Sequence, residues 1–147
     1  MGSTSAAAAT AGFGMRRVLD GSFAEALDHV PEALKAEGFG VLTQIDVRQT
    51  LRERLGVEFR PYRILGACNP PLAHRALEAQ LEIGLMLPCN VIVYEADDDR
   101  AVVVAVDPMQ TVAAQGSPVI AEVAGQVREK LERVLDRLGG SPRLPPG

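Results

Sequence analysis

Apolar residues follow two different periods along the chain, and the changes of period predict the order of its elements. From residue 118 to 138 they recur every three or four positions, which predicts one long helix with a single apolar stripe. Runs with strand character lie between this helix and the N-terminal region. The strands are expected at the following residues: 13–19, 39–45, 62–67, 89–95 and 101–106.

The first predicted helix has a clear N-terminal cap and contains a proline in its interior. Ser22 and Glu25 form a capping box, because each side chain can reach the backbone N–H of the other residue. Pro31 lies nine residues after this start and removes the hydrogen bond to the carbonyl of Leu27. We therefore expect a kink or a break in the helix at Pro31.

Further helix starts combine a capping residue with proline. Asn69-Pro70 predicts a helix that runs to about residue 79, since Asn is a favoured N-cap and Pro a favoured first helical residue. Asp107-Pro108 and Ser117-Pro118 repeat the pattern before a short helix and before the long last one. Asp46 caps another short helix.

Composition and length favour one folded domain. The chain has 147 residues, of which 47% are hydrophobic, enough for a core without disulfide staples. Low-complexity residues at 1–12 indicate a disordered leader, and the Pro- and Gly-rich residues 139–147 indicate a flexible tail. We expect a single α+β domain over residues 13–138.

Charge and cysteine content narrow the partners. The formal net charge is −4 and the basic residues are scattered, so a nucleic-acid partner is not expected. The apolar runs fall short of the ~20 residues that a membrane helix needs. Two cysteines do not make a disulfide scaffold. A cytoplasmic protein with two free thiols is the expectation.

The distinctive chemistry lies at two Cys-Asn pairs. Cys68 ends a strand just before the cap at Asn69, so we expect free helix amides near its sulfur to favour a thiolate. An inert packed thiol is the alternative. Cys89 begins an apolar strand with Asn90, where burial would raise the thiol pKa. The bond between Leu87 and Pro88 is expected to be trans.

Other candidate ligands near these pairs have ordinary explanations too. Asn69 is a helix cap, and Asn90 can satisfy a backbone group at a sheet end. His74 follows Cys68 in the predicted third helix and can act as its base or as a soft-metal ligand. A solvated surface histidine is the alternative. If the two strands are neighbours, both Cys-Asn pairs can meet at one end of the sheet.

Recognised catalytic and cofactor motifs do not occur in the sequence. It contains no Gly-x-Ser-x-Gly, His-Glu-x-x-His or Cys-x-x-Cys, and no Gly-rich phosphate loop follows a strand. Two cysteines and one histidine do not complete a tetrahedral zinc site within one chain, although two chains together could do so. The sequence therefore names no reaction and no cofactor.

The order of these motifs resembles the family called domain of unknown function 302. The segments that carry the resemblance are Gly38-Phe39-Gly40-Val41-Leu42-Thr43, Ile45-Asp46-Val47, Tyr62-Arg63-Ile64-Leu65-Gly66-Ala67-Cys68-Asn69-Pro70, Leu87-Pro88-Cys89-Asn90-Val91 and Asp107-Pro108. The resemblance implies a two-layer α+β sandwich, in which a curved, mainly antiparallel sheet is backed by helices, one of them a long C-terminal helix. It also implies a homodimer, and it supplies no activity.

Three functional hypotheses follow. The first is a module that binds a small molecule or an anion in a pocket near the Cys-Asn pairs, with helix-start amides as anion ligands. The second is thiol redox, persulfide or soft-metal chemistry at Cys68 and Cys89. The third is a structural homodimer without catalysis, whose interface is the strand at 102–106 or the last helix.

Overall fold

The computed structural model describes residues 12–113 and 116–141. The predicted leader, except for its last residue, and the tail beyond residue 141 lie outside this part of the chain. The elements follow in this order: β1 (Gly14–Val18), α2 (Phe23–Ala36), β2 (Gly40–Asp46), α3 (Val47–Leu55), β3 (Tyr62–Cys68), α4 (Pro70–Ala79), the 3-10 helix η1 (Leu81–Met86), β4 (Cys89–Glu95), β5 (Ala101–Val106) and α5 (Pro118–Leu138).

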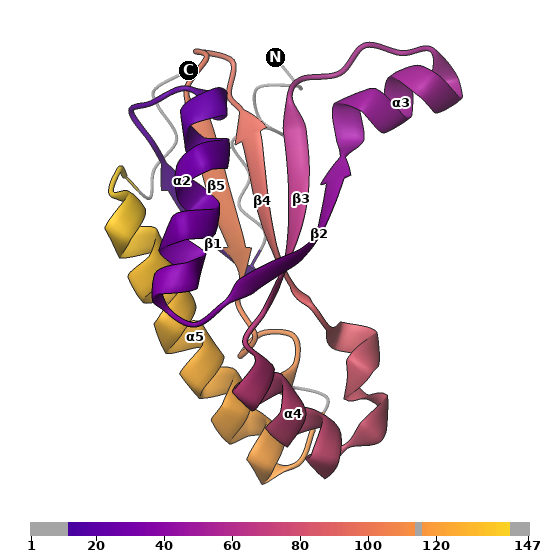
Figure 1. Cartoon of the computed structure of the whole chain (residues 1–147), viewed down its shortest axis with the longest axis vertical. Helices are drawn as coiled ribbons and strands as arrows, with labels where there is room; N and C mark the ends of the chain where they lie inside the picture. The colour runs from indigo at the N-terminus through magenta and orange to yellow at the C-terminus, as the bar shows by residue number, and fades with distance from the viewer. Residues whose placement is uncertain (1–11, 114–115, 142–147) are drawn as a thin grey trace.

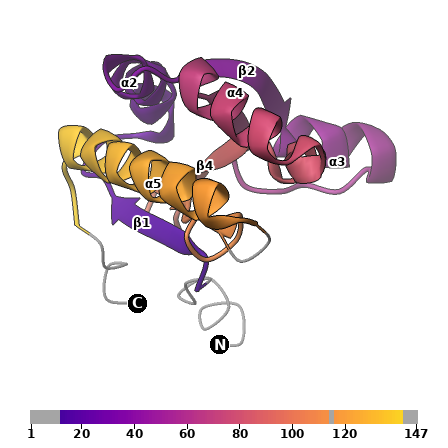
Figure 2. The ribbon, with the colours of Figure 1, turned by 90° about the horizontal axis from the view of Figure 1, so that it is seen from below.

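The five strands form one antiparallel sheet in the order β1-β5-β4-β3-β2. Helices α2 and α5 pack side by side over one face, and α4 continues this layer beyond the end of the sheet (Figures 1 and 2). Helix α3 lies out beyond β2 and β3 and has no buried residue. The predicted α+β fold, with its antiparallel sheet and long C-terminal helix, is confirmed.

The apolar stripe of α5 fills the core between the sheet and α2. Val127, Leu131 and Val134 are buried there, with Val30 and Leu34 of α2 opposite them. Strand β5 is paired on both edges, with β1 and with β4. The apolar stripe of α5 and both edges of β5 are thus occupied within one chain, and a dimer interface at these elements stays a prediction.

Helix α2 continues through Pro31 without a break. The expected break is wrong because proline removes one internal hydrogen bond, whereas Val30 and Leu34 on either side of it are fully buried in the core. Packing of this apolar face outweighs the single lost bond.

Two further predictions about prolines are wrong: the short helix at Asp107-Pro108 and the trans bond before Pro88. Among the described residues, Asp107-Pro108 is followed by turns at 108–112 and not by an α-helix. The Asp107 carboxylate accepts the N–H of Met109 at 2.9 Å, and the Asp107 carbonyl accepts that of Gln110 at 3.0 Å. The Leu87-Pro88 bond is cis, not trans.

The start of the predicted flexible tail is held against the sheet. Gly139 and Gly140 have φ values of 77° and 76°, which turn the chain back. Ser141 then forms a β-bridge with Val18 of β1. Among the described residues, no helix is both long and apolar enough to cross a membrane.

Candidate functional site: an apolar pocket with two thiols

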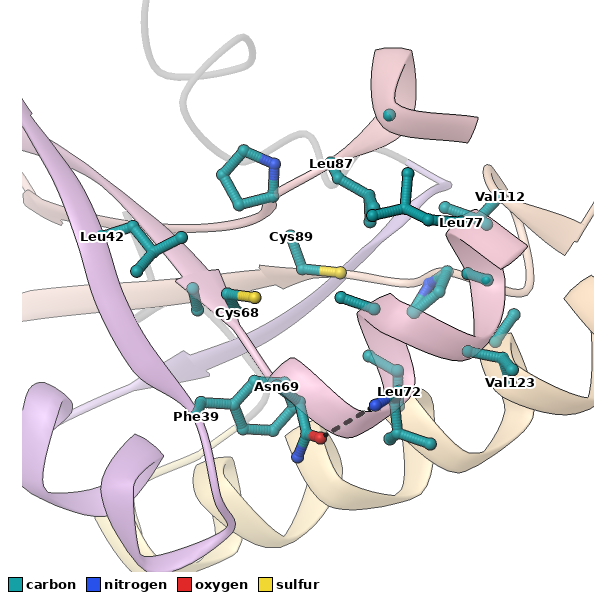
Figure 3. A pocket seen from close by; sticks show the side chains of 18 residues that line it. Phe39, Leu42, Cys68, Asn69, Leu72, Leu77, Leu87, Cys89, Val112 and Val123 are labelled. Carbon is teal, nitrogen blue, oxygen red and sulfur yellow. Dashed lines mark hydrogen bonds between the residues drawn. The ribbon is translucent and has the colours of Figure 1, made fainter. Parts of the chain in front are cut away.

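Strands β3 and β4 are neighbours, and this brings both cysteines to the same end of the sheet. Their antiparallel register pairs Ala67 with Cys89, so that Cys68 is the next residue along β3. Beyond this end, Asn69 caps α4, and the loop from η1 leads into β4. Both cysteine side chains project into one pocket, as Figure 3 shows.

The pocket has a volume of about 290 Å³ and lies between the end of the sheet, α4 and α5. Each of these elements presents small or aliphatic side chains, because the apolar stripes of α4 and α5 face each other here. The two helices contribute Leu72, Ala73, Ala76, Leu77, Val123, Ala124 and Val127. Phe39 and Leu42 close the side toward β2, and Leu87 and Val112 close the opposite side.

None of the described residues that line the pocket carries a charge. Among these described residues, Asn69 is the single polar side chain besides the thiols, and it is only 8% exposed. Its Oδ1 accepts the N–H of Leu72 at 3.4 Å, while its Nδ2 donates to the carbonyl of Glu37 at 3.3 Å. With both ends of this amide occupied, the pocket offers a ligand two thiols and an apolar wall.

Asn69 also belongs to a junction of three helices. Glu37, the C-cap of α2, accepts from Asn69 at the start of α4 through its carbonyl. Its carboxylate accepts from Arg133 at 2.8 Å and from Arg137 at 3.2 Å, both on α5. The hydrogen bond from Arg133 is the main reason why the pKa of Glu37 is lowered. We call Glu37, Asn69, Arg133 and Arg137 the Glu37 junction.

The expected free amides beside Cys68 are absent from the start of α4. Pro70 and Pro71 have no N–H, the N–H of Leu72 is taken by the Asn69 side chain, and that of Ala73 donates to the Asn69 carbonyl at 2.9 Å. The expectation that free amides at this helix start lie beside Cys68 is therefore wrong. Pro70, which made the helix start recognisable, and its neighbour Pro71 both lack the donor that the prediction required.

Cys89 is buried, and this changes its acidity. Burial is the main cause that raises the pKa of its thiol to about 11, and a negative charge on Cys68 adds to the effect. Cys89 is thus protonated at neutral pH. Cys68 is more accessible than Cys89.

Asn90 and His74 do not line this pocket. Asn90 pairs with Gly66 across β3 and β4 and is exposed, because successive strand residues point to opposite faces and Cys89 takes the inner one. The side chain of His74 is 73% exposed, with Nε2 3.5 Å from a carboxylate oxygen of Glu78 on the same helix. The structure brings together Cys68, Asn69 and Cys89 and separates the other two candidates from them.

Two tight contacts shape the pocket, and only one had a signal in the sequence. A Cβ on Gly66 would lie 2.3 Å from Oγ1 of Thr43 and 2.8 Å from Cγ of Pro88, so only glycine allows this approach. Asp107 accepts from Nε of Arg128 at 3.0 Å, which ties the loop after β5 to α5. Gly66, Thr43 and Pro88 all belong to segments that carry the family resemblance, whereas nothing in the sequence paired Asp107 with Arg128.

Comparison with known proteins places the chain in a family. The model of "Domain of unknown function DUF302" matches residues 15–138. The chain belongs to the DUF302 family. A crystal structure of an uncharacterized conserved DUF302 protein from Bacillus stearothermophilus is 33% identical, with a TM-score of 0.81. The match covers 88% of this chain and all of that one. A comparison with curated proteins found no match.

Family membership confirms the resemblance seen in the sequence motifs. The family has no assigned function, so the chemistry must be inferred from the residues of the site. Within the described part of this DUF302 chain, no three His, Cys, Asp or Glu side chains gather where they could hold a metal ion. The site therefore consists of a neutral pocket and a pair of thiols.

Proposed function

We propose that this DUF302 chain binds a small, neutral and mainly apolar molecule in the pocket beside Cys68 and Cys89. The observation that carries the proposal is the lining: its described residues are uncharged, and its one amide side chain is already hydrogen-bonded at both ends. Such a surface gains free energy from apolar contact, whereas a charged ligand would lose its hydration without compensation.

The size of the pocket supports a small ligand. At about 290 Å³ it lies at the lower end of the range typical of sites for drug-sized molecules. A molecule of one to three aromatic rings, or a short aliphatic chain, fits this volume better than a dinucleotide does.

An anionic ligand has less support than a neutral one, because the cap-plus-proline pairs offer it few free donors. Asn69 and Ser117 accept from the third residue of their helices, and Asp107 places a carboxylate at the remaining start. At α4, the helix start that borders the pocket, no N–H of the first turn is left for an anion. A neutral ligand is the better match.

Displacement of a neutral fluorescent probe, N-phenyl-1-naphthylamine, tests the proposal. Benzyl alcohol, benzoate and benzylammonium share one ring and differ in charge. We expect benzyl alcohol to displace the probe at a concentration at least about tenfold lower than either ion, because the site cannot solvate a charge. Equal competition by all three, or no binding of the probe, would contradict the proposal.

Two alanines of α4 provide a matched pair of variants. Ala73 lines the pocket and Ala79, on the same helix, is exposed and does not line it. Ala73→Leu should fill part of the pocket and weaken probe binding, whereas Ala79→Leu should leave it unchanged. Both substitutions are nearly neutral for helix propensity, so a difference between them reports on the pocket.

We further propose that two copies of the chain associate through β2. This strand forms one edge of the sheet, and its Leu42 and Ile45 are 67% and 49% exposed. An edge strand with exposed apolar residues favours pairing with another strand. Light scattering should give twice the chain mass of 15.7 kDa, and Ile45→Lys should shift the protein to monomer. A wild-type monomer at micromolar concentration would refute the dimer.

A further inference from the structure

The two thiols are placed to bind one centre together. Cys68 follows the residue that pairs with Cys89 across β3 and β4, so their Cα atoms lie about 6 Å apart by the geometry of adjacent antiparallel strands. That separation falls within the Cα range of bridged cysteines. Cys68, the last residue of β3, turns its side chain into the pocket instead of following the alternation of the strand. Both sulfurs point into the same pocket (Figure 3).

Charge restricts which centre the pair can hold. Two bound thiolates carry two negative charges, and no described lining residue is positive to balance them. A monovalent copper ion would leave a net charge of −1 in an apolar pocket, which is costly. Zinc would require further ligands, and no third His, Cys, Asp or Glu gathers with the pair among the described residues. The bridged product should therefore be neutral.

A trivalent arsenic atom that carries one organic group meets this requirement. It forms two bonds to sulfur, and the dithiolate product has no charge. Its organic group can lie in the pocket and contact the apolar lining. We infer that Cys68 and Cys89 form a dithiol site for trivalent organoarsenicals, R–As(OH)₂, with the group R in the pocket. The inference rests on the proposed function, because R occupies the same space as the neutral ligand.

The reaction balances without an oxidant. Two S–H bonds and two As–O bonds break, two As–S bonds form, and the two protons leave with the two hydroxyl groups as water. Arsenic stays trivalent and both sulfurs keep their oxidation state. Cys68, the more accessible thiol, reacts first, and Cys89 closes the ring from inside the pocket.

The protonated state of Cys89 is compatible with this reaction. Its pKa of about 11 would oppose a metal ion, which must displace the thiol proton into solvent. The arsenical instead takes up that proton in the water that it releases. Affinity for the arsenical should therefore change little between pH 6 and pH 8, the range in which metal binding to thiols depends steeply on pH.

The experiment is a titration of the full chain with phenylarsine oxide, which hydrates to phenyl–As(OH)₂. Thiol counting and intact mass should show one arsenical per chain and no remaining free thiol. Cys68→Ser and Cys89→Ala should each weaken binding at least about 100-fold, since each removes chelation. Circular dichroism checks that both variants fold. Two arsenicals per chain, or one remaining free thiol, would overturn the inference.

Two comparisons separate this inference from the proposed function. Ala73→Leu should weaken phenylarsine oxide but not inorganic arsenite, which has no organic group, and Ala79→Leu should affect neither. Failure of the naphthylamine probe to bind the wild type would refute the neutral pocket. If the probe binds but the thiols stay free in the presence of phenylarsine oxide, only the dithiol site is refuted. Copper(I) binding as tight as that of the arsenical would contradict the charge argument.

Discussion

The same dipeptide, Cys-Asn, occurs twice at one end of the sheet and has a different environment each time. In the first pair the asparagine is buried and bonded at both ends, and the cysteine is partly accessible. In the second pair the cysteine is buried and the asparagine faces solvent. The inversion arises because Asn69 leaves its strand to cap a helix, whereas Asn90 continues one. Identical residues therefore acquire separate roles from the element that follows them.

The largest difference between the pairs should appear in thiol reactivity. At pH 8 a thiol with a pKa of about 11 reacts roughly 200-fold more slowly than free cysteine, because so little of it is thiolate. Iodoacetamide kinetics on Cys68→Ser, which leaves Cys89 alone, should show this slow rate. The reciprocal Cys89→Ala variant should react faster. Similar rates for the two variants would remove the distinction between the thiols.

The two asparagines should differ next in their effect on stability. Asn69→Ala removes a helix cap and leaves the carbonyl of Glu37 without this donor, so we expect a loss of about 2 kcal/mol in the free energy of unfolding. Asn90→Ala changes an exposed side chain and should cost less than about 0.5 kcal/mol. Urea denaturation measures both, and losses of equal size would contradict the structural distinction.

The smallest expected effect is a dependence of stability on alkaline pH. The pKa of Cys89 is raised from 9.0 to about 11 on folding, so the unfolded chain loses this proton first as pH rises. The stabilisation is complete below about pH 8 and declines by about 0.8 kcal/mol between pH 8 and pH 9.5.

Cys89→Ala provides the reference for that measurement. The difference in unfolding free energy between wild type and this variant should narrow over the same pH interval, while contributions from other titrating groups cancel. A difference that stays constant with pH would show that the thiol does not keep its proton more tightly in the folded chain.

The fold was largely predictable because its elements carry local signals. Strands β4 and β5 and helix α5 have the predicted bounds, since each combines a clear period with a strong stop or cap. The continuation of α2 through Pro31 was not predictable from local signals. Its effect depends on the burial of Val30 and Leu34 against α5 and the sheet, which is information from distant parts of the chain.

The site was only partly predictable. Cys68, Asn69 and Cys89 were recognised as unusual residues, but the expected amides depended on a general rule for helix starts. Reading Pro70 and Pro71 as missing donors would have corrected that expectation from the sequence alone. The neutral lining required the structure, because Leu42, Leu87 and Val123 are ordinary apolar residues until three elements bring them together.

The Glu37 junction has a consequence for the thermodynamics of binding. It ties the end of α2 to the start of α4 and to α5, two of the helices that form the pocket wall. These bonds link the helices of the cavity wall in the absence of a ligand, which favours a cavity that is already formed before binding. A ligand then meets a preorganised surface and spends little of its contact energy on ordering the protein. We therefore expect the ligand to enter a preformed cavity without a large rearrangement of the helices around it.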